Sequence, residues 1–166
     1  MSEGEHDFSF HLGDQFFASF EGSEITRGEL EARVVLDNRA GALALSFHLE
    51  GEVEVVCDRC LDPFMTEIHS VQQLIVKRGD VPGELDDDVI VIGKDDHEID
   101  VRQYLYEFVV LAVPYKRIHP LDKNGNSTCN PEMIKILAAH RKRKDHRKEK
   151  TDPRWNVLKG ITGNNH

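Results

Sequence analysis

Residues 43–57, LALSFHLEGEVEVVC, decide the fold of this chain. Apolar side chains occupy almost every odd position of this stretch, and polar or charged side chains occupy most of the even positions. A period of two residues is typical of a β-strand with one buried side and one solvent-facing side. Because a strand of this length is unusual, we expect a kink, a bulge or a break at Gly51.

Further strands are predicted on both sides of this stretch. Residues 30–36 alternate in the same way, and residues 37–41, DNRAG, have the composition of a hairpin turn between the two strands. Shorter or less regular strands are expected at residues 8–12, 15–20, 64–76 and 89–92. Residues 80–88 are acidic and contain Pro82 and Gly83, so they are predicted to form a solvated loop.

The pattern changes from strand to helix near Asp100. Asp100 can cap a helix, with Gln103 at the reciprocal position of a capping box. Apolar side chains then recur at helical spacing until Pro114, and we expect this stripe to pack on the sheet. A second helix is predicted from Asn130 and Pro131, an N-cap followed by proline at the first helical position.

These patterns predict an α+β fold. We expect a bent antiparallel sheet, or a partly closed β-barrel, from residues 8–92, with one helix near residues 101–113 packed against it. The predicted domain boundary lies at residue 120. Residues 1–120 would form an acidic β-rich domain, and residues 121–166 a helical, basic C-terminal extension.

Length and composition indicate a protein of the cytoplasm. The 166 residues include 39% apolar side chains, enough for the core of one domain without disulfides. No apolar run approaches the ~20 residues of a transmembrane helix, and the acidic N-terminus lacks the features of a signal peptide. Three cysteines, an odd number, fit a reducing compartment better than a disulfide framework.

Charge is divided unevenly along the chain. Residues 1–100 carry 24 acidic and 7 basic side chains, and residues 101–166 carry 6 acidic and 14 basic ones. The corresponding net charges are −17 and +8, within an overall charge of −9. The first segment would therefore repel nucleic acid and the second would attract it.

The basic side chains are densest in residues 141–150. Such a run neutralises phosphates without reading base sequence, and it contains no aromatic side chain on which bases could stack. The predicted nucleic-acid contacts are Arg141, Lys142, Arg143, Lys144, Arg147 and Lys148. Two other interpretations stay open: the run is an ordinary solvated segment, or it folds back on the acidic body until RNA competes for it.

Residues 57–60, CDRC, form the motif with the most chemical content. Two cysteines at this spacing can bind one metal ion, and a structural Zn²⁺ needs two further ligands. Cys129, directly before the second predicted helix, and His119 are the candidates. Alternatively, Cys57 and Cys60 are reduced core residues. A thiol–disulfide exchange site is disfavoured, because a proline and another strand follow the motif where such sites have a helix.

Residues 57–64, CDRCLDPF, are followed by the Asp-rich connection and by residues 101–114, VRQYLYEFVVLAVP, in an order that resembles the YceD family. These are the large ribosomal RNA subunit accumulation proteins. The resemblance covers about residues 25–131. It implies a bacterial or plastidial protein associated with accumulation of the large-subunit (23S) rRNA, and it brings no catalytic residues.

The chain departs from the commoner family pattern in its later cysteines. Many members carry a second cysteine group after the proline that ends the helix, whereas residues 119–131 of this chain contain only Cys129. Either His119 replaces a ligand, or this branch has lost the metal. The polar part beyond Pro131 is interpreted as a lineage-specific extension.

The predicted function is therefore that of a non-enzymatic ribosome biogenesis factor. It would bind the large-subunit rRNA precursor or a ribosomal protein, with no membrane and no small-molecule substrate. The alternatives are a structural zinc-binding interaction module, a thiol oxidoreductase using Cys57 and Cys60, and a hydrolase using Asp86, Asp87 and Asp88. Both enzyme versions lack a phosphate-binding glycine loop, a nucleophile elbow and a helical histidine pair.

Overall fold

The computed structural model describes residues 4–39, 42–86, 88–96 and 98–145. Contacts divide the chain into two compact units, Met1–Pro120 and Leu121–His166. Two domains, as predicted with a boundary at residue 120, would also have to fold independently of each other. The division into domains stays a prediction. No helix of the described residues is long and apolar enough to cross a membrane.

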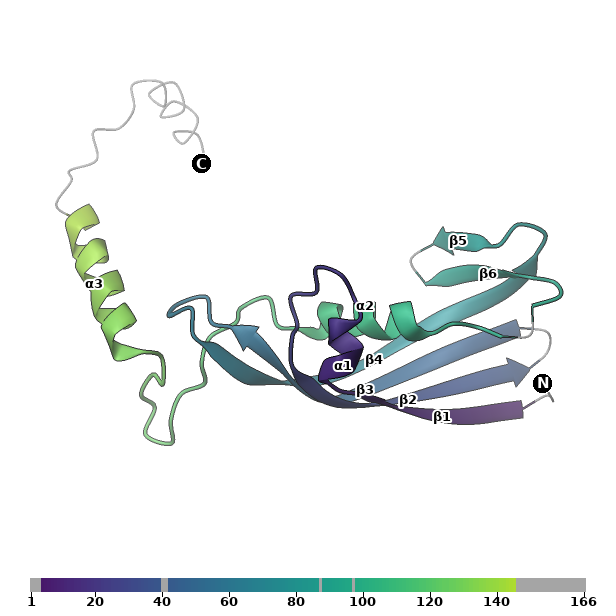
Figure 1. Cartoon of the computed structure of the whole chain (residues 1–166), viewed down its shortest axis with the longest axis horizontal. Coiled ribbons are helices and arrows are strands. Elements are labelled where there is room, and N and C mark those ends of the chain that lie inside the picture. Colours follow the sequence, from purple (N-terminus) through teal and green to yellow (C-terminus); the bar gives the residue numbers. More distant parts are fainter. Residues whose placement is uncertain (1–3, 40–41, 87, 97, 146–166) are drawn as a thin grey trace, which may run out of the picture. The chain divides into compact units, whose positions relative to one another are not determined.

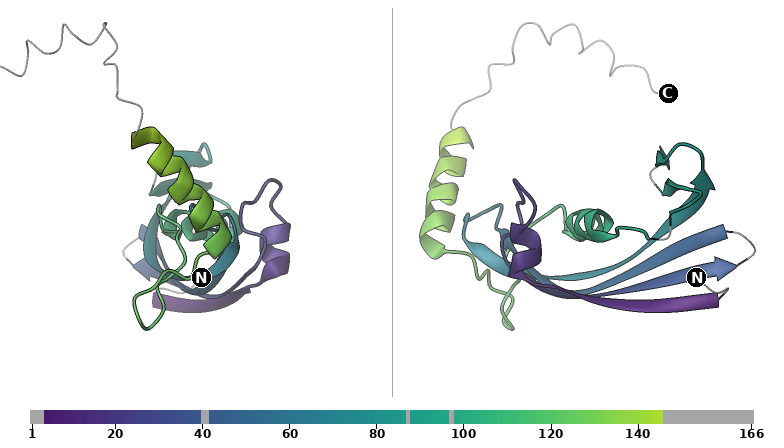
Figure 2. Two further views of the ribbon diagram at one scale, coloured as in Figure 1. Left: turned by 90° about the vertical axis from the view of Figure 1, so that its left-hand side faces the viewer. Right: turned by 45° about the vertical axis from the view of Figure 1, so that its right-hand side comes forward.

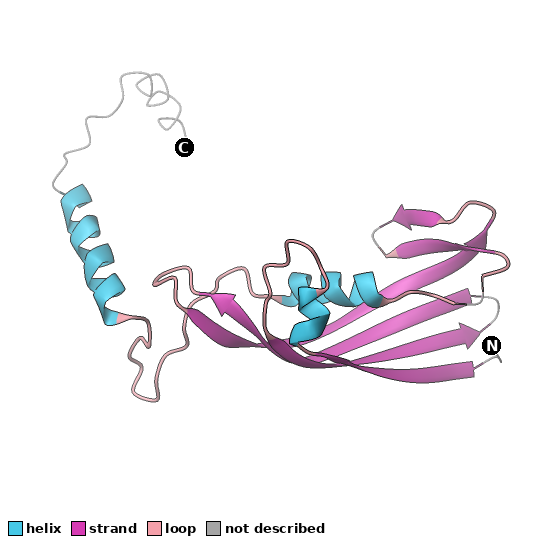
Figure 3. Ribbon diagram, viewed as in Figure 1, coloured by secondary structure: helices cyan, strands magenta, loops and turns pink. Residues whose placement is uncertain are grey.

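The described part of the first unit contains six strands of one sheet and two helices (Figures 1 and 3). In chain order they are β1 (Gly4–Leu12), α1 (Asp14–Ala18), β2 (Gly28–Arg39), β3 (Ala42–Val56), β4 (Pro63–Gly79), β5 (Gly83–Asp86), β6 (Val89–Gly93) and α2 (Arg102–Ala112). The strand order is β1-β2-β3-β4-β6-β5, and every neighbouring pair is antiparallel except β4 and β6. The predicted α+β fold with a bent sheet is confirmed. The sheet formed by the described strands is open.

β3 is the long strand predicted at the centre of the fold, and it runs without interruption. Its register with β2 and β4 is regular along its whole length, so the predicted bulge or break at Gly51 is wrong. Gly51 has a φ of 149°, and a methyl group there would overlap the carbonyl oxygen of Glu29 and lie 2.6 Å from Leu30 Cα. The glycine therefore allows the backbone of β2 to approach closely.

The core lies on the face of the sheet that α2 covers, and the sheet curves towards this helix (Figure 2). As predicted, the alternating apolar positions of β2 and β3 are buried there. The buried side chains of α2 are Leu105, Phe108 and Val109, and the Phe108 ring packs edge-on against Phe47 with centroids 4.9 Å apart. Burial of these large side chains is the main stabilising contribution of the helix.

The start of α2 differs from the predicted capping box. The N-cap of α2 is Val101, one residue after the predicted Asp100. Asp100 Oδ1 nevertheless accepts a hydrogen bond from the Arg102 backbone N–H at 2.9 Å. Gln103, however, donates to Glu107 Oε1 at 2.7 Å, one turn further along the helix. The reciprocal part of the predicted capping box is therefore wrong, because Gln103 has a partner at i+4.

Residues 15–20, predicted as a strand, instead contain helix α1. Phe16 donates its backbone N–H to the Gly13 carbonyl at 2.9 Å, and Asp14 Oδ1 accepts the N–H of Gly28 at 3.0 Å. This turn buries the Phe17 ring completely. Tertiary burial thus overrides the strand preference of an aromatic run. The predicted loop at 80–88 also needs correction, because it contains the short, exposed edge strand β5.

The second unit is described for residues 121–145 and contains helix α3 (Pro131–Asp145). Asn130 Oδ1 accepts the Glu132 backbone N–H at 3.0 Å, which confirms the predicted N-cap with Pro131 in the first turn. Before the helix, the backbone N–H of Asn126 donates to Asp122 Oδ1 at 2.8 Å. This bond and others nearby lower the pKa of the Asp122 carboxyl.

Candidate metal centre

The turn after β3 carries Cys57 and Cys60, both of them buried. Leu61 donates its backbone N–H to the Cys57 carbonyl at 3.0 Å, and Cys57 donates its own to the Asp62 carbonyl at 3.0 Å. Leu61 has a φ of 62°, a left-handed conformation that is uncommon for a residue other than glycine. The Arg59 N–H also donates to Cys57 Sγ at 3.4 Å. Backbone bonds therefore hold the two cysteines in one tight turn.

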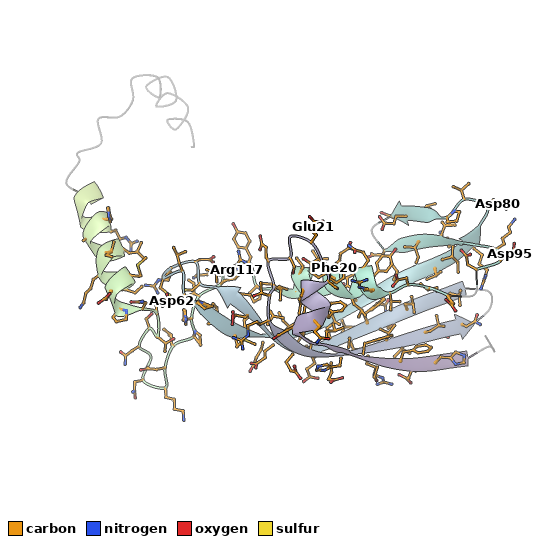
Figure 4. The ribbon with its side chains drawn as sticks, in the orientation of Figure 1. Phe20, Glu21, Asp62, Asp80, Asp95 and Arg117 are labelled. Atoms are coloured by element: carbon orange, nitrogen blue, oxygen red, sulfur yellow. The ribbon has the colours of Figure 1, made fainter. Side chains whose placement is uncertain are left out.

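A later segment of the same unit is hydrogen-bonded to this turn. The Asp58 backbone N–H donates to the Arg117 carbonyl at 2.7 Å, and the Arg117 backbone N–H donates to Asp58 Oδ2 at 2.8 Å. The Arg117 guanidinium lies 3.8 Å from Asp58 Oδ1 and 3.4 Å from Glu24 Oε2. Arg117 and Asp62 lie at this end of the sheet (Figure 4). The reciprocal Asp58–Arg117 pair therefore fixes residue 117 against the cysteine turn.

His119 follows this anchored position by two residues. Its Nδ1 atom lies 3.4 Å from Cys60 Sγ, and its ring packs on Phe64 with centroids 4.6 Å apart. The Phe64 ring thus fixes the orientation of the imidazole, and a ring nitrogen faces the Cys60 thiol. In this orientation His119 and Cys60 could bind the same metal ion.

Three of the side chains predicted as metal ligands come together within the first unit. One ligand atom from each of Cys57, Cys60 and His119 lies within 4.8 Å of the others, whereas Cys129 belongs to the second unit, and its part in the site stays a prediction. All three cysteines are buried, and His119 is half-buried. Two thiols and one imidazole placed this close together could bind a metal ion, and Cys129 would complete a typical donor set of structural zinc sites. Among the described residues it is the one group of three or more such side chains that could do so.

The pKa of the Cys57 thiol reflects this environment. Burial raises the pKa. The backbone N–H groups of Cys60, Arg59 and His119, together with the His119 side chain, have a larger opposite effect and lower the pKa to about 6. Each of these hydrogen bonds stabilises the thiolate over the thiol. The thiolate is the form that binds metal, so Cys57 is prepared for ligation at neutral pH.

We expect Cys57 in the metal-free protein to ionise near pH 6, instead of near the usual ~8.5 of a free cysteine. Because the pKa is lower in the folded state, the ionised thiol stabilises the fold fully above ~8.5, and this contribution is lost as the pH falls through about 6. Ultraviolet absorbance of the thiolate during a pH titration measures the step. Cys57→Ser should remove it, and a first thiol step near ~8.5 in the wild-type protein would contradict the assignment.

A family model described as "Large ribosomal RNA subunit accumulation protein YceD" matches residues 45–162. The chain belongs to the YceD family. Its family role is therefore in accumulation of the large ribosomal RNA subunit. No curated protein and no solved structure matches the chain.

The extent of the YceD match corrects one interpretation of the sequence. The match begins at residue 45, not near residue 25, and it continues to residue 162. The segment beyond Pro131, interpreted as a lineage-specific extension, thus lies within the region that the YceD family shares as far as residue 162. The predicted metal ligands at positions 57, 60, 119 and 129 also lie within that region.

The predicted nucleic-acid contacts of this YceD protein fall at the end of the described chain. Arg141 is exposed on α3, and the backbone of Lys142, Arg143 and Lys144 belongs to the same helix. Arg147 and Lys148 lie outside the described residues. Their role in RNA binding stays a prediction.

The face of the sheet opposite α2 carries a group of carboxylates that the sequence analysis did not single out. Pairing places Glu31 of β2 directly opposite Glu50 of β3, Glu29 opposite Glu52, and Glu52 in turn opposite Glu67 of β4. We call these five exposed residues the acidic face. The alternating positions of β2 and β3 contained the signal, but only the strand register shows that the carboxylates are adjacent.

The basic side chains near the acidic face are a histidine that contacts it and arginines that contact other carboxylates. His11 lies 3.2 Å from Glu31 and 3.5 Å from Glu29. Two nearby arginines contact carboxylates outside this group, Arg27 with Glu54 at 3.3 Å and Arg33 with Asp7 at 2.6 Å. Like charges directly opposite each other on neighbouring strands destabilise a sheet. The acidic face therefore reduces the stability of the fold instead of adding to it.

Proposed function

We propose that this protein is a non-enzymatic factor that binds a basic ribosomal protein of the large subunit through the acidic face. The observation that carries the proposal is the row of glutamates placed opposite one another on β2, β3 and β4. A cationic partner would relieve their repulsion, and its lysines and arginines would be shielded until they meet rRNA. The net charge of −17 on residues 1–100 supports a cationic protein over RNA as partner of this face.

The acidic-face variant Glu31→Gln with Glu50→Gln tests the proposal. It should raise the free energy of unfolding by about 0.2–1 kcal/mol, because one directly opposed like-charge pair is removed. It should also weaken binding of a synthetic lysine- and arginine-rich peptide, measured by fluorescence anisotropy at low salt. A gain in stability together with a loss of binding excludes misfolding as the cause of the loss.

Glu84→Gln with Asp86→Asn is the matched control, since both carboxylates lie on the exposed edge strand β5, away from the acidic face. This control should bind the peptide as the wild-type protein does. Equal weakening by both double variants would show that only the overall charge matters, and it would overturn the proposed face.

Binding of the rRNA precursor is the second candidate, and the basic segment at residues 141–150 favours it. Its lysines and arginines would contact phosphates, with an affinity that falls steeply with salt. RNA binding would depend on residues 141–150, whereas protein binding would depend on the acidic face. Partners held through RNA would be lost after RNase treatment, and partners held by the acidic face would not.

The second part of the proposal is a structural Zn²⁺ held by Cys57, Cys60, His119 and Cys129. The fit rests on the donor set, three thiols and an imidazole, and on the ligand atoms of Cys57, Cys60 and His119, which lie mutually within 4.8 Å in the first unit. When bound, the ion would supply a closed, four-ligand cross-link of residues 57–60 with 119 and 129. The position of the cysteine pair in a turn between two strands, with no helix following, supports this role over thiol exchange.

Asp58→Ala should weaken zinc binding by about 10–100-fold, because residues that orient metal ligands usually have effects of this size. Asp58 holds Arg117, and thereby His119, against the cysteine turn. Competition with a coloured zinc chelator measures the affinity. Glu24→Ala is the control, since Glu24 contacts only the guanidinium of Arg117 at 3.4 Å. Equal affinities of Asp58→Ala and wild-type protein would show that the pair does not position the ligand.

A further inference from the structure

β1 has one edge that no other described strand pairs with (Figure 1). It is an outer strand of the sheet, and its nine residues pair regularly with β2 on the inner side. The strand contains neither proline nor a bulge, two of the devices that natural proteins use to block a free edge. β1 is therefore competent to accept another strand.

Two phenylalanines of β1 are exposed beside this edge. Phe8 is directly opposite Val34, and Phe10 is directly opposite Ala32, so both rings lie on the core face of the sheet. They nevertheless remain 42% and 37% exposed. With Leu36, Leu43, Ile92 and other side chains they line a groove of about 640 Å³. Exposed aromatic rings on the core face indicate that this part of the apolar surface lacks a cover.

The sequence of β1 fits a second copy of itself. Its central residues 6–11, HDFSFH, place the two phenylalanines symmetrically about Ser9. In antiparallel pairing about a two-fold axis at Ser9, Phe8 would lie opposite Phe10 of the partner subunit. Asp7 would lie opposite His11 of the partner subunit, and each also has a contact in its own chain, Asp7 with Arg33 at 2.6 Å and His11 with Glu31 at 3.2 Å. Moving the axis by one residue loses both of these matches.

We propose that the protein forms a two-fold symmetric dimer in which the β1 strands of two copies pair antiparallel about Ser9. The sheets of the two copies then continue into one another, and four phenylalanines form one apolar strip across the interface. Direct aromatic cross-strand pairs stabilise such a ladder. Each patch is its own complement, as a two-fold interface requires.

Ser9→Cys tests the register of this dimer. Residues directly opposite in an antiparallel pair have Cα atoms about 4.5–5.5 Å apart, which a disulfide can span. Ser9 is exposed, so mild oxidation of the full-length variant should give a disulfide-linked dimer on a non-reducing gel. Ser46→Cys is the control, because Ser46 lies on the same face but between Val35 of β2 and Gln73 of β4. It should stay monomeric on the gel.

Sedimentation of the full-length protein tests the interface independently of the cross-link. The wild-type protein should sediment as a dimer, and Phe8→Lys with Phe10→Lys should convert it to a folded monomer. Val71→Lys, at an exposed position on β4, should leave the dimer intact. A monomeric wild-type protein would overturn the proposal, and so would a dimer that resists the double lysine variant. The cross-linking and sedimentation results do not depend on whether the acidic face binds a ribosomal protein.

Discussion

Gly51→Ala is expected to lower the free energy of unfolding by about 3–5 kcal/mol, a large fraction of the stability of a small domain. Two effects add. The φ of 149° at this position is a conformation that side-chain-bearing residues rarely adopt. The added methyl group would also overlap the backbone of β2 at Glu29 and Leu30, which cannot move without disturbing the register of two strands. Urea denaturation of the purified protein measures the loss.

Gly22→Ala is the matched control for this prediction. Gly22 also has a positive φ, 75°, but nothing lies within 4 Å of the position that its methyl group would occupy. Alanine there should cost only the left-handed conformation, about 1–2 kcal/mol. Equal losses in the two variants would show that the close approach of β2 and β3 contributes nothing.

Cys57→Ser is expected to abolish zinc binding and to remove about 4 kcal/mol of stability, the contribution of a ligand present at a thousand times its Kd. The purified wild-type protein should contain about one zinc per chain, because four ligands complete a structural site. Serine is nearly isosteric with cysteine, so the loss reports on the metal and the ionised thiol and not on packing. Metal analysis and thermal unfolding check the two parts of the prediction.

A chelator supplies the control for the zinc prediction. It should lower the thermal midpoint of the wild-type protein towards that of Cys57→Ser, stopping short of it near neutral pH because the ionised Cys57 thiol also stabilises the metal-free fold, and it should leave the variant unchanged. Cys129→Ser should behave as Cys57→Ser does, which tests the ligand that is most distant in sequence. Wild-type protein that contains no zinc and gains no stability from added zinc would establish the cysteines as ordinary core residues.

The sequence predicted the parts of the fold that depend on local periodicity. Alternation along β2 and β3 identified the buried face, because one face of a half-buried strand must be apolar. The helix at residues 15–20 was missed because burial of Phe17 depends on residues elsewhere in the fold. The role of Gly51 was misjudged for the same reason, since the constraint comes from the neighbouring strand.

The candidate metal centre was accessible from residue type and spacing, which suggested Cys57, Cys60, His119 and Cys129 as a group. The Asp58–Arg117 pair was not, because it joins residues that are 59 positions apart and no local pattern marks it. The acidic face lies between these cases. Each glutamate is visible in the alternation, but the opposition of like charges exists only in the paired sheet.

Binding of a large-subunit ribosomal protein to the acidic face can be tested in cell extracts. The tagged full-length protein is purified with and without RNase, and the retained proteins are identified. We predict that at least one large-subunit ribosomal protein is retained after RNase treatment by the wild-type chain and is lost by Glu31→Gln with Glu50→Gln. Loss of every ribosomal protein after RNase treatment would contradict the claim and assign the contact to rRNA.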